Sequence, residues 1–292
     1  MAVATRSRYE MWMWRRIFKR IIIPCVLFLV LLIGLILGLR SCGSDDDEPQ
    51  QTPYSSETDV NDTDTTDTLP VGGQPTYQDF DFTTYNEDAI VEIDAAYLNS
   101  YLVLVNKIFR LSEDFSPQDL VLPEVLSAGG GDNTNHRMRE TAARALEDMF
   151  NAARVEEGLV LWAVSGYRSF EEQRSKHQYF IDTNGYETAE RMSARPGHSE
   201  HQTGLVMDVT AASVDALLTE EFSNVPEGVW LRENAHRFGF IIRYPYGRMN
   251  LTGIVYEPWH VRYVGIEAAT YIFENNIVLE QYIFPVPRGE QS

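Results

Sequence analysis

An unbroken apolar run from Ile21 to Leu39 decides which part of this chain can fold in water. As a helix, the run would be about 28 Å long, close to the roughly 30 Å hydrocarbon core of a bilayer. Four basic residues precede it between positions 15 and 20, and four acidic residues follow between positions 45 and 48. Because positive charge stays on the cytoplasmic side, this pattern predicts a cytoplasmic basic segment (1–20), a transmembrane anchor (21–39) and an extracellular remainder.

Two other interpretations of this N-terminus stay open. A cleaved signal peptide would have an apolar region of only about 7–15 residues, followed by a small-residue cleavage site. A lipoprotein-type modification would use Cys42, but Arg40 does not suit the cleavage motif that precedes such a cysteine. The sequence therefore favours an uncleaved single-pass protein of the cell membrane that contacts the lipid bilayer through one helix.

The segment that follows the apolar run is acidic and poor in core-forming residues. Nine Asp and Glu residues and no Lys or Arg occur between positions 43 and 78, where Thr, Ser, Pro, Gln and Gly fill much of the rest. Such a stretch buries too little apolar surface to offset the entropy of ordering it. Residues 40–78 are therefore predicted to be a disordered linker, which leaves residues 79–292 as the folded domain.

Charge and cysteine content restrict what this domain can be. The chain has 24 Lys and Arg against 43 Asp and Glu, a net charge of -19, which argues against a nucleic-acid partner. Both cysteines, Cys25 and Cys42, precede the domain. A disulfide framework and a cysteine-ligated zinc site are therefore excluded from residues 79–292.

Hydrophobic periodicity predicts an α+β fold, with long helices early and short strands later. The predicted strands cover residues 159–164, 203–209, 239–244 and 259–264. The predicted helices cover residues 92–110, 137–154, 169–180 and 229–239. In the first of these, apolar residues from Tyr97 to Ile108 recur at helical spacing.

A small set of histidines and carboxylates in the later strands suggests a metal site. His201 precedes Asp208 by seven positions, and His260 follows Glu257 by three. Two histidines and one carboxylate suit a catalytic zinc with one position open for water, and Glu257 could take a proton from that water. Pro258 argues against the helix-borne zinc motif. On spacing alone, unrelated polar residues in loops and strands stay an alternative.

Three longer motifs favour one interpretation. Residues 165–173 read SGYRSFEEQ, residues 193–208 read SARPGHSEHQTGLVMD, and residues 257–265 read EPWHVRYVG. In this order they closely resemble the signatures of the VanY-type D-alanyl-D-alanine carboxypeptidases. Val206 stands where that family usually has Ala, a change that crowds the packing behind the site without removing a ligand.

The resemblance implies a zinc carboxypeptidase domain over residues 79–292, with a small antiparallel sheet flanked by helices. It assigns Zn²⁺ to His201, Asp208 and His260, and the catalytic roles to Glu257 as general base and Arg168 as the donor that stabilises the oxyanion. Ser199 and Gln173 are the expected substrate-binding residues.

The expected substrates are peptidoglycan stem peptides, from which a D,D-carboxypeptidase would remove the terminal D-Ala. Removal of D-Ala from tetrapeptide stems by an L,D-carboxypeptidase is a second possibility. A catalytically inactive cell-wall-binding protein on the same fold is a third, which the retained ligands and Glu257 disfavour.

Overall fold

The computed structural model describes residues 81–128 and 133–284. These residues belong to the second of two units into which the chain divides, Gly73–Ser292. The predicted cytoplasmic segment, anchor and linker lie outside the described residues and stay predictions. Within the described part, no helix is long and apolar enough to cross a bilayer.

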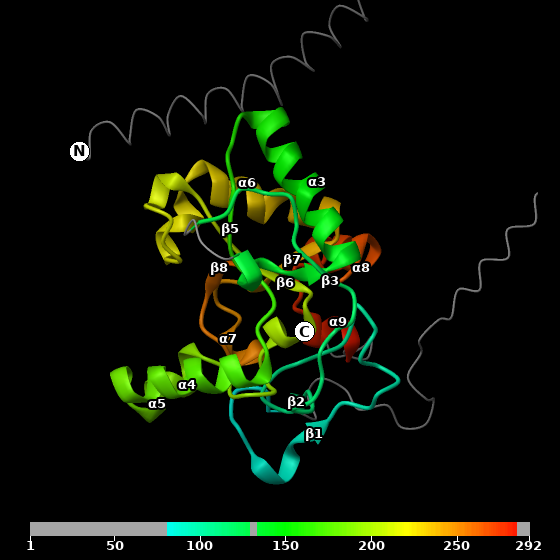
Figure 1. The fold of residues 1–292 in the computed structure, drawn as a ribbon, viewed down its shortest axis with the longest axis vertical. Helices are drawn as coiled ribbons and strands as arrows, with labels where there is room; N and C mark the ends of the chain where they lie inside the picture. Colours follow the sequence, from blue (N-terminus) through cyan, green and yellow to red (C-terminus); the bar gives the residue numbers. More distant parts are fainter. Residues whose placement is uncertain (1–80, 129–132, 285–292) are drawn as a thin grey trace, which may run out of the picture. The chain divides into compact units, whose positions relative to one another are not determined.

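A four-stranded antiparallel sheet forms the centre of this unit (Figure 1). The spatial order is β5-β6-β8-β7. These strands are β5 (Trp162–Ser165), β6 (Val206–Thr210), β7 (Phe240–Tyr244) and β8 (Glu257–Tyr263). The smaller pairs are parallel β1 (Val91–Glu92) with β2 (Phe109–Arg110), and antiparallel β3 (Leu120–Val121) with β4 (Met138–Arg139). All four predicted strands are present, with ends shifted by a few residues.

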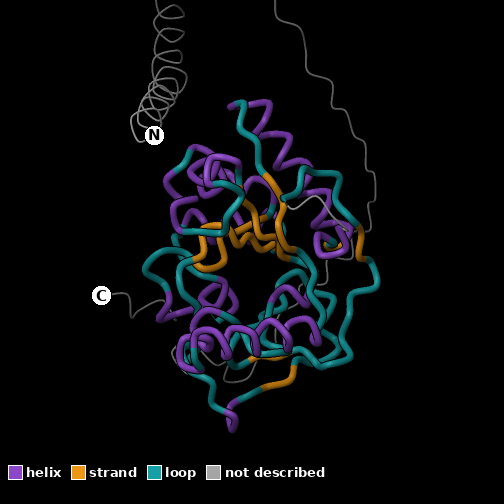
Figure 2. The backbone as a smooth tube through the Cα atoms, turned by 60° about the vertical axis from the view of Figure 1, so that its left-hand side comes forward, coloured by secondary structure: helices purple, strands orange, loops and turns teal. Residues whose placement is uncertain are grey.

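Helices lie on both sides of the strands, as Figure 2 shows. They are α3 (Glu140–Glu157), α4 (Phe170–Asn184), α5 (Tyr186–Met192), α6 (Pro226–Asn234), α7 (Met249–Thr252), α8 (Ile266–Glu274) and α9 (Leu279–Ile283). Three of the four predicted helices correspond to α3, α4 and α6. The last of these ends at Asn234, and a 3₁₀ turn (Ala235–Phe238) completes the predicted span. The predicted α+β class, with helices around a small antiparallel sheet, is confirmed.

The two faces of the central sheet differ in chemistry. Alternate residues of the middle strands, including Met207 and Val261, are fully buried in the apolar core together with α3 and α6. The residues between them, including Asp208 and His260, point to the opposite face, because successive side chains of a strand alternate. Figure 1 shows α4 and α5 on that second side. The polar residues of the predicted site therefore share one face of the sheet.

The helix predicted for residues 92–110 is wrong. The chain there makes the short strands β1 and β2 with turns between them. Its polar side chains bind the local backbone. Asp94 accepts from the amide of Ala96, Ser100 from that of Leu102, and Asn106 from those of Ile108 and Phe109. Such bonds compete with the backbone hydrogen bonds of a helix. The spacing of apolar residues alone does not reveal this competition.

Helix α3 supplies much of the apolar core, so substitutions in this helix test the packing directly. Leu146 is fully buried in that core, whereas Val155, on the same helix, is 70% exposed. We expect Leu146→Ala to lower the free energy of unfolding by about 2–5 kcal/mol, because it leaves a cavity. Val155→Ala, the matched control, should change it by less than about 0.5 kcal/mol. Urea denaturation measures both, and equal effects would contradict this assignment of the core.

Candidate active site

Pairing of the two middle strands brings two of the predicted ligands together. Asp208 in β6 lies directly opposite His260 in β8 in the antiparallel register. His201 comes from a short 3₁₀ turn (Glu200–Thr203) just before β6. Gly204 ends this turn with a φ of 68°, a left-handed conformation that glycine adopts without strain. The turn and the strand register thus place all three side chains at one point.

Among the described residues, these three could together hold a metal ion, and we call them the metal group. Their potential ligand atoms all lie within 4.8 Å of one another. The carboxylate of Asp208 is central, with Oδ2 3.4 Å from Nε2 of His201 and Oδ1 3.2 Å from Nδ1 of His260. Burial raises the pKa of Asp208, but the two histidines outweigh burial and hold that pKa well below its usual range. Asp208 is therefore a carboxylate at neutral pH, as a metal ligand would have to be.

The hydrogen bond of His201 shows which ring nitrogen can bind metal. Its Nδ1 lies 2.6 Å from the carbonyl oxygen of Gly166, which can only accept. Nδ1 therefore carries the proton, and Nε2, which faces Asp208, keeps a free lone pair. Oδ1 of Asp208 is buried and has no hydrogen-bond partner in the described part of the chain. Two imidazoles and one such carboxylate fit Zn²⁺, with a fourth position left open.

Glu257 begins β8 and lies beside this group. Its Oε2 is 3.4 Å from Nδ1 of His260. Burial raises the pKa of Glu257 to about 7, against the opposing charge of His260. A carboxylate with a pKa near neutrality can both accept and return a proton. The segment is a strand, so the Glu257–His260 spacing is not helical, as Pro258 had indicated.

Arg168 and Gln173 meet at the start of α4. A capping box between Ser169 and Glu172 fixes where this helix begins. Immediately before it, the guanidinium of Arg168 donates to Oε1 of Gln173 and to Oγ of Ser165, both at 2.8 Å. Gln173 in turn donates to the carbonyl of Ala194 at 2.6 Å. In this structure Gln173 therefore holds the Arg168 side chain in place, and its direct contact with substrate stays a prediction.

Ser199 stands at the entrance to the turn that carries His201. It is buried, and its side chain makes no capping hydrogen bond to this turn. The structural role that a serine usually has at such a position is therefore absent here. Ser199 lines the same cavity as Arg168 and Glu257. A substrate contact by Ser199 stays a prediction.

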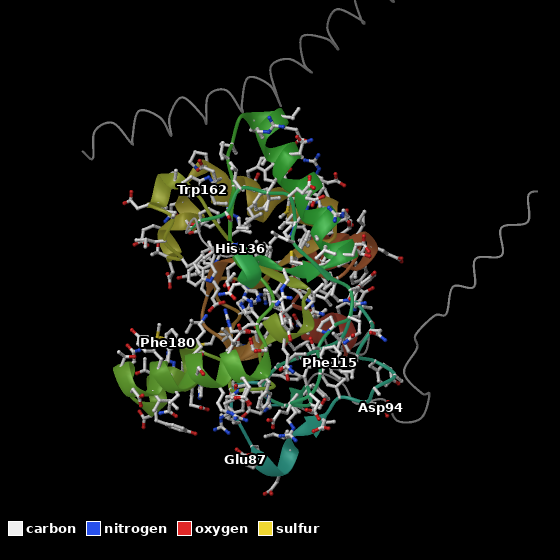
Figure 3. All side chains as sticks on the ribbon, viewed as in Figure 1. Glu87, Asp94, Phe115, His136, Trp162 and Phe180 are labelled. Atoms are coloured by element: carbon white, nitrogen blue, oxygen red, sulfur yellow. The ribbon has the colours of Figure 1, made fainter. Side chains whose placement is uncertain are left out.

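All seven predicted site residues line one cavity of about 260 Å³. The cavity lies between the polar face of the sheet and α4, with Phe180 of α4 (Figure 3) and Trp259 of β8 among its apolar walls. The structure thus brings all seven predicted site residues to one cavity.

Two residues near the site were not predicted. Lys176 lines the cavity three residues after Gln173 on α4, a spacing that places both on one helix face. Glu200 is fully buried beside His260. Burial raises the pKa of Glu200, but Arg243 and Arg262 outweigh burial and hold that pKa well below its usual range. Helical spacing could have indicated Lys176, whereas the arginine partners of Glu200 are visible only in the fold.

Comparison with known proteins identifies the family. The family model VanY, D-alanyl-D-alanine carboxypeptidase, matches residues 135–266. The putative carboxypeptidase YodJ of Bacillus subtilis is 36% identical over 258 residues, which cover 88% of this chain and 94% of YodJ.

Two solved structures are similar over most of the described unit. The LdcB LD-carboxypeptidase aligns with a TM-score of 0.63 and 41% identity, covering 68% of this chain and 91% of LdcB. A mutant of the vancomycin-resistance D,D-pentapeptidase VanY, solved with Zn(II), aligns with a TM-score of 0.52 and 35% identity, covering 63% and 98%. The resemblance in the motifs is confirmed: this chain belongs to the VanY family of D-alanyl-D-alanine carboxypeptidases.

Proposed function

We propose that this chain is a zinc-dependent D,D-carboxypeptidase that removes the terminal D-Ala from peptidoglycan stem peptides. The observation that carries the proposal is the convergence of His201, Asp208 and His260 beside the buried carboxylate of Glu257. The Zn(II) in the VanY neighbour supports the choice of metal. Zinc, when bound, supplies a water of lowered pKa and polarises the scissile carbonyl.

Protein groups around that metal would transfer the proton and stabilise the developing negative charge. Glu257 accepts the proton of the attacking water at Oε2 and returns it to the leaving amine nitrogen. Arg168 donates to the carbonyl oxygen as negative charge develops there. Its hydrogen bonds to Gln173 and Ser165 fix the guanidinium beforehand, so little reorganisation is needed when that charge appears.

A carboxypeptidase must also bind the free carboxylate at the end of its substrate. Lys176 is the second cation in the cavity, and its charge interacts with those of Asp208 and Glu257 across it. Lys176 is half-buried, and this burial lowers the pKa of its ammonium. An anion beside it would compensate for that burial. We therefore assign the substrate's terminal carboxylate to Lys176, with Ser199 as a neighbouring donor.

An L,D-carboxypeptidase that acts on tetrapeptide stems is the second candidate. The similarity to the LdcB LD-carboxypeptidase, with its TM-score of 0.63, supports it. The family model, described as D-alanyl-D-alanine carboxypeptidase, supports the D,D activity. Both reactions break an amide before a terminal D-Ala, so the same metal group and base serve either one.

Substrate masses distinguish these activities. The full-length chain, purified in detergent with zinc, should shorten a pentapeptide stem by one alanine. Loss of alanine from the tetrapeptide alone would instead establish the L,D activity. A pentapeptide ending in a carboxamide should react far more slowly than the free acid, because Lys176 then lacks its anionic partner. A chain that binds cell-wall sacculi yet shortens neither peptide would be the inactive wall-binding protein.

Two substitutions separate metal binding from proton transfer. Glu257→Ala should retain stoichiometric zinc while losing about 100- to 10,000-fold in turnover, because the general base is gone. His201→Ala should lose the metal itself, because it removes one of three ligands. Zinc content by elemental analysis, together with kcat, measures both effects. Undiminished turnover of Glu257→Ala would exclude this residue as the base.

We further propose that residues 21–39 anchor the chain in the cell membrane with the catalytic domain outside. The length of the apolar run and the basic residues before it support this topology. The intact chain should co-sediment with membranes at its full mass, and protease added to intact spheroplasts should remove the domain. A shortened, freely released chain would show that the N-terminus is a cleaved signal peptide.

A further inference from the structure

One buried carboxylate has no role in the proposed reaction. It lies beside His260, on the side of the ring away from Asp208. The side chain of Glu200 is 0% exposed. It stands one residue before His201, at the start of the same 3₁₀ turn. An ionised side chain this deep must be matched by partners on the protein, because water cannot reach it. The partners of its two oxygens differ.

One oxygen of Glu200 belongs to an ion-pair cluster. Oε1 accepts from Nε of Arg243 at 2.8 Å and from Nη1 of Arg262 at 2.6 Å. Both arginine side chains are fully buried on the polar side of the sheet. Glu280 of α9 pairs with Arg243 through two hydrogen bonds of 2.9 and 2.6 Å. Two negative and two positive charges therefore balance, and Glu200 is held as a carboxylate.

The surrounding backbone fixes the position of this cluster. Nη2 of Arg262 donates to the carbonyls of Tyr101 and Val103, at 2.9 and 2.7 Å. Asn106 donates to Glu280 at 3.3 Å, while its own side-chain oxygen accepts from the amides of Ile108 and Phe109. The segment wrongly predicted to be a helix thus binds Arg262 directly, and it holds Glu280, the partner of Arg243, through Asn106. Glu200 has little freedom to move away from His260.

The other oxygen of Glu200 faces the metal ligand. Oε2 lies 3.8 Å from Nε2 of His260, slightly beyond hydrogen-bond distance. Neither atom has a hydrogen-bond partner within residues 81–128 and 133–284. Nδ1, on the other edge of the same imidazole, faces Asp208 at 3.2 Å. The ring therefore has one nitrogen at the metal position and the other against a fixed carboxylate.

We propose that Glu200 is the positioning residue for His260, accepting a hydrogen bond from Nε2–H so that the proton stays on Nε2 and Nδ1 keeps its lone pair for the metal. The proposal rests on the zinc site of the proposed function. Glu200 would do for His260 what the carbonyl of Gly166 does for His201. That carbonyl binds Nδ1 of His201 and leaves Nε2 free for the metal. A partner of this kind sets the tautomer and orientation of a ligating histidine and makes it a stronger ligand.

Two simpler roles for Glu200 do not account for this geometry. It is not a fourth ligand, because the imidazole of His260 stands between its carboxylate and the metal position. A purely structural ion pair would use both oxygens on the arginines, as Glu280 does on Arg243. Glu200 instead leaves Oε2 for the histidine.

Glu200→Gln tests this role in the full-length chain. The variant keeps the shape of the side chain but cannot offer a full negative charge to Nε2–H. Zinc affinity, measured by competition with a chromophoric chelator, should fall by about 10- to 100-fold. Glu280→Gln is the matched control, because it removes a buried charge from the same cluster without facing His260. Both variants should lower Tm, but Glu280→Gln should bind zinc like the original chain.

The histidine proton gives a second readout that a structural role would not change. In the zinc-loaded chain with ¹⁵N-labelled histidine, the Nε2–H of His260 should give a downfield, exchange-protected proton resonance. This resonance should persist in Glu280→Gln and shift upfield or vanish in Glu200→Gln. The original chain must show this resonance whatever the variants do. The proposal can therefore still be tested if Glu200→Gln fails to fold.

Three results would overturn the proposal. They are unchanged zinc affinity in Glu200→Gln, equal losses of affinity in both variants, and a rapidly exchanging Nε2–H in the original chain. A failure of the original chain to bind zinc at all is a different result, because it would contradict the proposed function rather than the role of Glu200.

Discussion

The antiparallel register that places Asp208 opposite His260 is the constraint on which the whole site depends. A slip of one residue would turn these side chains into the apolar core and expose Met207 and Val261 in their place. Burial of those two residues against the same core as α3 therefore specifies the register. The packing on the apolar side of the sheet thus determines the geometry of the metal group on the other side.

The polar face of the sheet carries charges that few interiors tolerate. Asp208, Arg243, Arg262 and Glu200 are all nearly inaccessible to water. Buried ion pairs are often no more stabilising than apolar residues of similar volume, so stability alone is a weak reason for this arrangement. Its physical consequence is positional, because a fully paired cluster fixes where each group lies. That property suits the surroundings of a metal ligand better than flexible surface charges would.

Sequence reasoning was most informative where the candidate residues lie close together in the chain. Residues 193–208 hold two of the three candidate ligands, His201 and Asp208, so one motif predicted most of the group that could hold a metal ion. The helix predicted for residues 92–110 failed because Asp94, Ser100 and Asn106 bind local backbone amides, and apolar spacing does not register such bonds. The partners of Glu200 come from positions 243, 262 and 280, whose proximity only the folded chain creates.

The motifs could not decide between D,D and L,D activity, because the residues that would decide it are also far apart in the sequence. In the proposed mechanism, His201, Asp208, His260 and Glu257 would act on the scissile carbonyl, the attacking water and the leaving amine. These groups are the same in both reactions. The two substrates differ in the residue that carries this carbonyl, the one before the terminal D-Ala. The configuration and side chain of that residue must fit the cavity walls. Specificity therefore depends on the shape of walls that include Phe180, Met192 and Trp259. These come from α4, α5 and β8, so their relative placement is set by packing and not by any single motif.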